Sequence, residues 1–221
     1  MNQKQKTPTK SFKDWQAEEV EDAFMLTKLR TSPLLEELKT IRFDANHAYY
    51  QMLDKYRLEA FDLINGWNED EYKFLFISPF LKLVDFSGTH FNVFTQRPLS
   101  IRYDNDTKET KGIVEWMLAR GKQIPKLPHF FLHEYKPEKN RDNDPIGQLL
   151  IAMVAAQTLN ADNQPIYGIY VNGRNWFFVV LDAKEYTVSN AYNITSDDIF
   201  TLFAALVFLR GKMEELYQML P

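Results

Sequence analysis

The sequence predicts a mixed α/β fold in which helices pack on a β-sheet. Segments with helical periodicity alternate with runs of β-branched and aromatic residues, in the order helix, strands, helix, strands, helix. An Asn-Gly pair at 172–173 separates two apolar runs, as in a β-hairpin. The chain has 221 residues, 45% of them apolar, which is enough to bury a sizeable core.

The N-terminal part is expected to form a helical layer. Residues 1–13 are polar and basic and are predicted to be a disordered lead-in. Residues 14–66 have helical patterns: Asp14 is a candidate cap for a helix that runs to about residue 29, and Pro33 starts a short helix. A longer helical stretch follows from residue 44 and closes at Gly66.

Residues 67–221 are expected to form the α/β core, in one compact domain with the helical layer. Asn68 and Glu71 fit the capping box of a helix that Pro79 kinks or ends. The apolar stripe of the last helix indicates either packing on the sheet or a homodimer face. Strands are predicted at 91–95, 99–103, 112–118, 128–136, 166–171, 175–181 and 186–189, and further helices after Asp144 and after Thr195 or Ser196.

Composition narrows the classes of function. The chain has no Cys, which excludes disulfides, thiolate nucleophiles and Cys-ligated zinc, and leaves oxygen and imidazole ligands for a metal. No apolar run approaches the roughly 18 residues of a membrane span, and the N-terminus lacks the apolar core of a secretory signal. We therefore expect a cytoplasmic protein with no membrane partner. The net charge of −4 argues against general attraction to nucleic acid.

The segment from Lys108 to Arg141 is positively charged, although the whole chain is negatively charged. Eight Lys and Arg residues in this range are set against four Glu, a net charge of +4. A solvated loop would produce the same imbalance, so the bias supports an anionic substrate only weakly.

The stretch from Phe130 to Lys136 contains two opposite charges in an otherwise apolar strand. Side chains alternate along a strand, so Glu134 and Lys136 share one face. Charges buried at the end of a strand are costly unless they pair with each other or with a metal. The simplest interpretation is a structural ion pair.

A second carboxylate, Glu115, lies inside another apolar strand. Ile113, Glu115 and Met117 are expected to share a face, so Glu115 and Glu134 would meet, beside Lys136, if the two strands are neighbours in the right register. Two converging carboxylates repel unless a cation lies between them or one binds a proton. Mg²⁺ suits this pattern because it accepts one or two carboxylates and leaves other positions to water and phosphate. A water activated by the metal is a ready nucleophile, which a nearby Lys can orient.

These motifs resemble those of the PD-(D/E)XK nuclease superfamily, metal-dependent phosphodiesterases of the restriction-endonuclease-like fold. Gly112-Ile-Val-Glu115 is similar to the family's Gly-x-x-Asp strand, and Glu134-Tyr-Lys136 to its (D/E)-x-K. Gly147-Gln148-Leu-Leu is similar to the Gln-containing helix that follows in many members. The resemblance spans roughly residues 68–157.

A further motif precedes these three. Asn68-Glu69-Asp-Glu71 ahead of Phe76-Ile-Ser-Pro79 is similar to the helix that opens the nuclease domains of type I restriction subunits, where an acidic residue reaches toward the metal. Glu69 fits this acid better than Glu71, whose other candidate role is the reciprocal partner in the helix cap.

The resemblance implies a restriction-endonuclease-like mixed sheet flanked by helices, with an extra helical N-terminal region. It implies a stand-alone Mg²⁺- or Mn²⁺-dependent endonuclease whose partner is nucleic acid, with DNA the preferred substrate. Glu115, Glu134 and the backbone carbonyl of Tyr135 would hold the metal, and Lys136 would assist the attacking water. Gln148 would orient the site or touch the phosphate backbone.

One residue departs from the family pattern. Where the family usually has Asp, this chain has Glu115, whose extra methylene moves the carboxylate by about 1.5 Å. The departure favours a rival hypothesis, a nuclease-like fold used as a binding or assembly module, as does the acidic net charge. An enzyme acting on a small molecule on the same sheet is a third, more distant hypothesis.

Two further patterns have simpler explanations. His129 and His133 would suit zinc on a helix, but on a strand four residues span about 13 Å and cannot share one metal. The aromatic residues of the hairpin around residues 167–178 could stack on bases, although alternating aromatic residues in a hairpin more often form core.

Overall fold

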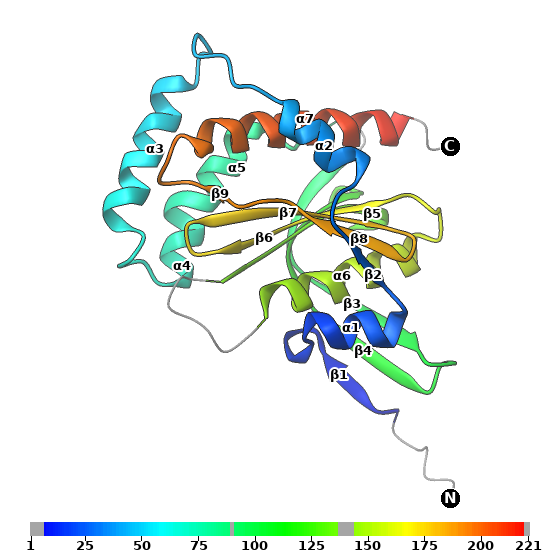
Figure 1. Cartoon of the computed structure of the whole chain (residues 1–221). Coiled ribbons are helices and arrows are strands. Elements are labelled where there is room, and N and C mark those ends of the chain that lie inside the picture. Colours follow the sequence, from blue (N-terminus) through cyan, green and yellow to red (C-terminus); the bar gives the residue numbers. More distant parts are fainter. Residues whose placement is uncertain (1–6, 89–90, 137–143, 219–221) are drawn as a thin grey trace, which may run out of the picture.

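The computed structural model describes residues 7–88, 91–136 and 144–218, with the backbone alone at 128–136 and 217–218. It contains a nine-stranded mixed sheet with helices on both faces (Figure 1), so the predicted α/β class is confirmed. The strands are β1 (Thr9–Ser11), β2 (Thr27–Leu29), β3 (Asn92–Tyr103), β4 (Lys108–Arg120), β5 (Lys126–Lys136), β6 (Ile166–Asn172), β7 (Asn175–Asp182), β8 (Glu185–Val188) and β9 (Tyr192–Asn193). Their order is β1-β4-β5-β6-β7-β8-β2, with β3 also on β4 and β9 on β7.

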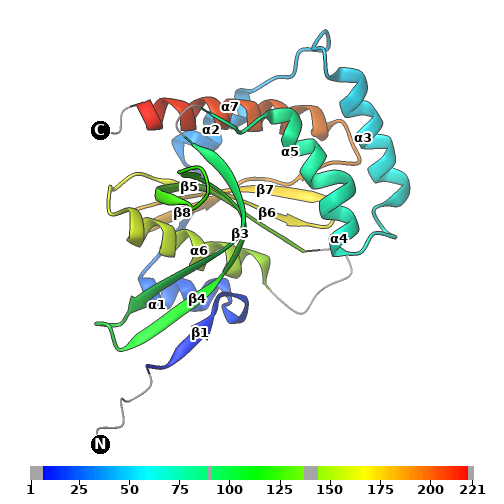
Figure 2. The ribbon, with the colours of Figure 1, turned by 180° about the vertical axis from the view of Figure 1, so that it is seen from behind.

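The helices form two layers, which Figures 1 and 2 show from opposite sides. One face of the sheet is covered by α2 (Pro33–Thr40), α5 (Ser78–Val84) and α7 (Asp198–Gln218), with α3 (Tyr50–Leu63) and α4 (Glu69–Tyr72) at one end. The other face is covered by α6 (Pro145–Asn160) and α1 (Ala17–Phe24), which follows the short 3-10 helix η1 (Phe12–Asp14). In the described residues, none of these helices combines the length and apolar character that crossing a membrane requires.

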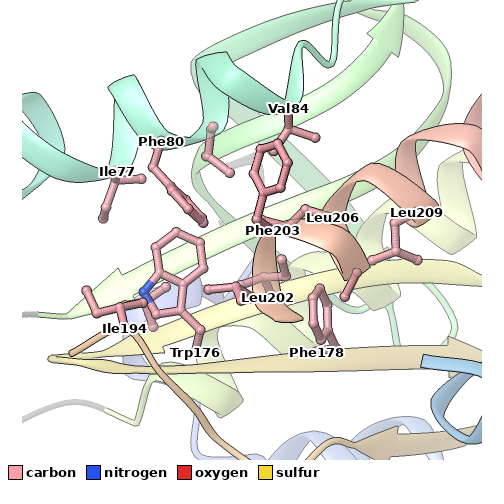
Figure 3. Close-up of a cluster of buried hydrophobic side chains, with 14 of the residues drawn as sticks. Ile77, Phe80, Val84, Trp176, Phe178, Ile194, Leu202, Phe203, Leu206 and Leu209 are labelled. Carbon is pink, nitrogen blue, oxygen red and sulfur yellow. The ribbon is translucent and has the colours of Figure 1, made fainter. Parts of the chain in front are cut away.

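Each face of the sheet has its own apolar core. On the α5 and α7 side, Phe80 and Phe203 lie over the buried indole of Trp176 (Figure 3). The apolar stripe of α7 belongs to this core, which supports the packing interpretation of that stripe. On the other side, α6 is buried on every residue from 147 to 156 because it lies between the sheet and α1.

The local signals for the helices that follow Asn68 and Asp144 and for the hairpin are confirmed, whereas Asp14 lies in η1 and the N-cap of α1 is Gln16. Asn68 accepts the amide of Glu71 at 3.0 Å, and the Glu71 carboxylate accepts the amide of Asn68 at 2.8 Å. Asp144 caps α6 by accepting the amide of Ile146 at 3.1 Å. Strands β6 and β7 pair as predicted, and Gly173 has the positive φ, 57°, that the turn requires.

The N-terminal prediction was wrong for residues 9–13 and 27–29. Residues 9–11 form β1, parallel to β4, and Phe12 is buried rather than part of a disordered lead-in. Residues 27–29 form β2, parallel to β8, where a helix was expected. Both strands take their hydrogen bonds from segments far along the chain, which local periodicity cannot reveal. Residues 1–6 lie outside the described part.

The bounds of other elements also differ from the prediction. The strands expected at 91–95 and 99–103 are one strand, β3, and the helical stretch expected from residue 44 begins as α3 at Tyr50. Pro79 does not end the helical segment, which continues from α4 through the π-helical segment η2 (Lys73–Ile77) into α5. Because Pro79 has no amide proton to donate, the wider π turn lies where a regular helix would lose a hydrogen bond.

A buried hydroxyl ties α4 to the sheet. The hydroxyl of Tyr72 donates to the carbonyl of Gly173 in the β6–β7 turn at 3.0 Å, and accepts from the indole nitrogen of Trp176 at 3.2 Å. Tyr72 is 1% exposed, so water does not replace these bonds readily.

We predict that Tyr72→Phe lowers the free energy of unfolding by about 1–3 kcal/mol, because it leaves a buried carbonyl and a buried indole N–H without this partner. Urea unfolding followed by circular dichroism measures the change. Tyr49→Phe is the matched control, since Tyr49 is 39% exposed, and should stay within about 0.5 kcal/mol of the parent. Equal stability of the two variants would contradict the assignment.

Candidate functional site

The described residues bring together two carboxylates and a lysine from α4, η2 and β4. The Lys73 ammonium lies 2.7 Å from Glu69 Oε1 and 2.8 Å from Glu115 Oε2. Gln96 of β3 donates its amide N–H to the same Glu115 oxygen. The side chains of Lys73 and Glu115 are 26% and 20% exposed, so this group is half-buried. We call Glu69, Lys73, Gln96 and Glu115 the carboxylate cluster.

The charge of Lys73 is stabilised by its neighbours. Burial alone would lower the pKa of Lys73, but hydrogen bonds and charge attraction from Glu115 and Glu69 outweigh it and raise the pKa above its ordinary value of 10.5. The lysine is therefore charged at neutral pH. The pKa of Lys73 is higher in the folded protein than in the unfolded chain. The contact therefore contributes its full stability at pH values below the ordinary pKa, and this stability is lost as the pH rises through the raised pKa.

Two departures from regular backbone structure deliver side chains to Glu115. Lys73 is the first residue of the π-helical segment η2. Gln96 has a φ of 54° inside β3, a conformation that a residue with a long side chain rarely adopts. Such irregularities cost free energy and concentrate at functional sites. Here both converge on one carboxylate oxygen.

The irregularity at Gln96 corrects one expectation. Ile113 and Met117 were predicted to share a face with Glu115, yet Ile113 is 47% exposed and Met117 is 0% exposed. Val114 and Met117 lie in the same core cluster although they are three residues apart. In a regular strand, side chains an odd number of residues apart point to opposite faces, so the alternation of β4 changes phase around Glu115. The strict alternation assumed for this strand is therefore wrong at this point.

The β4–β5 ladder ends beside Glu115. The two strands pair in antiparallel register up to Trp116 and His133, and Glu115 and Glu134 occupy the next position on each strand. Strand β5 stays paired with β6 as far as Lys136, which lies opposite Asn172. Within the described residues, β4 and β5 thus separate where the two glutamates lie. The side chains of Glu134, Tyr135 and Lys136 lie outside the described part.

The end of β5 lies at the same end of the sheet as the carboxylate cluster. Asn172, opposite Lys136, precedes Gly173, whose carbonyl accepts from Tyr72, the neighbour of Lys73 in sequence. Figures 1 and 2 both show the C-terminal end of β5 beside α4. The backbone at positions 134 and 136 therefore lies at the end of the sheet that is next to α4.

The structure distinguishes the two acidic residues of α4. The Glu71 carboxylate accepts the backbone amide of Asn68, and so has the capping role considered for it. Glu69 instead contacts Lys73, one turn later, and through it Glu115. Of the two, Glu69 is the acid directed to the cluster.

Gln148 lies apart from the cluster in the described structure. It is in the first turn of α6 and 8% exposed, and its side-chain carbonyl is buried without a hydrogen-bond partner in the described part of the chain. Two glycines of the sequence motifs are required by packing. A Cβ on Gly112 would lie 2.4 Å from the Phe12 ring, and one on Gly147 would lie 2.5 Å from the Trp15 carbonyl oxygen.

Other candidate features are only partly described. His129 and His133 both belong to strand β5, and their side chains lie outside the described part. In the basic range 108–141, Lys108 is neutralised by Asp104 at 2.9 Å. Residues 137–143, with two of the basic side chains, are not described.

The described residues contain no group of three or more His, Asp or Glu side chains placed to hold a metal ion. Glu115 and Glu69 are two carboxylates linked by a lysine.

Neither a scan against protein-family models nor a search of curated proteins gave a match for this chain.

Sequence reasoning missed Lys73 and Gln96. Lys73 follows Glu69 by four residues on a predicted helix, which is the spacing of a helical ion pair and could have indicated it. Gln96 carries no comparable signal, because its importance depends on a backbone conformation that its residue type does not favour.

We predict a coupling energy of about 1–2 kcal/mol between Lys73 and Glu115 in a double-mutant cycle with Lys73→Met and Glu115→Gln, larger than the roughly 0.2–1 kcal/mol of exposed pairs. Chemical unfolding at pH 7 measures it. The control cycle uses Lys55 and Glu59, whose side chains are 72% and 42% exposed. Equal coupling in both cycles would contradict the half-buried geometry described for Lys73.

Proposed function

We propose that this protein is a Mg²⁺-dependent phosphodiester hydrolase that cuts DNA. One observation carries the proposal: a positive charge lies between two carboxylates at the point where β4 and β5 separate. The backbone register assigns Glu134 the position beside Glu115. Two carboxylates and one ammonium give the cluster a charge of −1, and a third carboxylate at this position would make it −2, which favours a cation.

The donor set fits a hard divalent cation. Glu115 and Glu134 are proposed as metal ligands, and both supply carboxylate oxygens of the kind that Mg²⁺ and Mn²⁺ prefer. The ammonium of Lys73 is a cation already accommodated at Glu115. When bound, the metal would neutralise charge on the phosphate and activate a water molecule.

The residues of the chain would position this chemistry. Gln96 orients Glu115 by donating to one carboxylate oxygen, and Glu69 adds negative charge from the helix side. Beyond His133, β5 is paired on its β6 side alone in the described ladder, and the Tyr135 carbonyl is the proposed third ligand. Lys136 would orient the attacking water and stabilise charge developing on the phosphate. Gln148, in the first turn of α6, is proposed to orient the site or to contact the phosphate backbone through its side-chain NH2, the group of this side chain that can donate to phosphate oxygens.

The order of elements supports the proposed restriction-endonuclease-like fold. The strands that carry the two motifs, β4 and β5, are antiparallel neighbours. The helix with Gln148 follows at once, and leads into β6 parallel to β5. The α4–α5 segment that resembles the opening helix packs at the same end of the sheet. Each motif thus lies on the type of element that the resemblance requires.

A second function is favoured by the same lysine. Because Lys73 already neutralises part of the carboxylate charge, the cluster could serve as an internal ion network in a nuclease-like binding or assembly module. A module of this kind would take up no Mn²⁺ in a calorimetric titration, whereas the hydrolase would.

We predict that Lys136→Ala reduces Mg²⁺-dependent nicking of supercoiled plasmid DNA by about 10²–10³-fold, because it removes a positive charge from the reacting phosphate. Lys126→Ala, on the same strand but at its other end, should retain activity. Circular dichroism checks that both variants fold. Nicking by folded Lys136→Ala at the parent rate would disprove the assignment.

A further inference from the structure

Lys73 and a divalent cation would compete for the same carboxylate, that of Glu115. Glu115 Oε2 already accepts from the Lys73 ammonium at 2.8 Å and from the Gln96 amide. A metal ion within bonding distance of that oxygen would lie against the ammonium, and two positive charges in contact repel strongly in a half-buried site. Lysine can leave because its charge sits on a long flexible stem, and this side chain is 26% exposed.

The backbone supports a specific role for this lysine. Lys73 begins a π-helical segment, and the partner of the same oxygen, Gln96, has a positive φ. A regular helix and a regular strand would place both side chains differently. Two costly local conformations thus bring Lys73 and Gln96 to Glu115.

We infer that Lys73 is an internal counter-ion, which keeps Glu69 and Glu115 together until a divalent cation replaces it at Glu115. The inference rests on the proposed metal site and adds a positioning residue to it. In the metal-free protein Lys73 holds the two carboxylates in place and weakens metal binding, since the metal must displace it.

Calorimetric titration of the full chain with Mn²⁺ tests this role. Lys73→Met removes the competing charge at similar length, and should lower the dissociation constant by about tenfold or more. The matched control is Lys82→Met, on the adjoining helix α5, because Lys82 is 78% exposed and 3.9 Å from Asp85; its affinity should equal the parent's. Adding Glu115→Gln to Lys73→Met should abolish the gain.

The outcomes separate this inference from the proposed function. If Lys73 has a purely structural role, Lys73→Met should bind Mn²⁺ with the same affinity as the parent or more weakly. If the parent binds Mn²⁺ and either of these results is found, the counter-ion inference is overturned and the proposed metal site is not. Absence of uptake in both the parent and Lys73→Met overturns the metal site and the inference together. Tighter uptake without any DNA cleavage supports the counter-ion and overturns the nuclease. Lys73→Gln replaces Lys73→Met if thermal unfolding shows that the latter does not fold.

Discussion

The buried hydroxyl of Tyr72 is the contact on which the rest of the site depends. It holds the α4–η2 segment to the β6–β7 turn by donating to Gly173 and accepting from Trp176. Lys73 is the next residue, so its ammonium reaches Glu115 on β4 only while Tyr72 keeps the helix in this position. The charged cluster is thus positioned by a neutral, buried hydrogen-bond network as well as by its own half-buried charges.

Local signals were sufficient to predict much of the fold. The capping box at Asn68 and Glu71, the cap at Asp144 and the turn at Gly173 are each decided by residues within a few positions of one another. The apolar runs between these signals, some with strand character and some with helical periodicity, then predicted a sheet with helices packed on it. Residues 9–11 and 27–29 could not be predicted in this way, because they are short, polar and paired with strands more than 90 residues away.

The candidate site was only partly predictable, for the same physical reason. The antiparallel pairing of the strands that carry Glu115 and Glu134 was expected, but their register was only assumed and comes from the structure. The ion pair of Lys73 with Glu69 was visible as a helical i, i+4 spacing, but its reach to Glu115 depends on tertiary packing. The change of phase in β4 was hidden, because Gln96 adopts a backbone conformation that its type disfavours.

The strand order has a consequence for how the chain folds. Strands β1 and β2 belong to the same N-terminal segment, yet they pair with residues 109–111 and 185–187. Contacts over such long separations carry a large loop-closure entropy and form slowly. During synthesis both strands emerge well before their partners exist. The segment that carries β1 and β2 is therefore made before its partners, and until it pairs with them the edges of β4 and β8 that it covers are open to pairing with other chains.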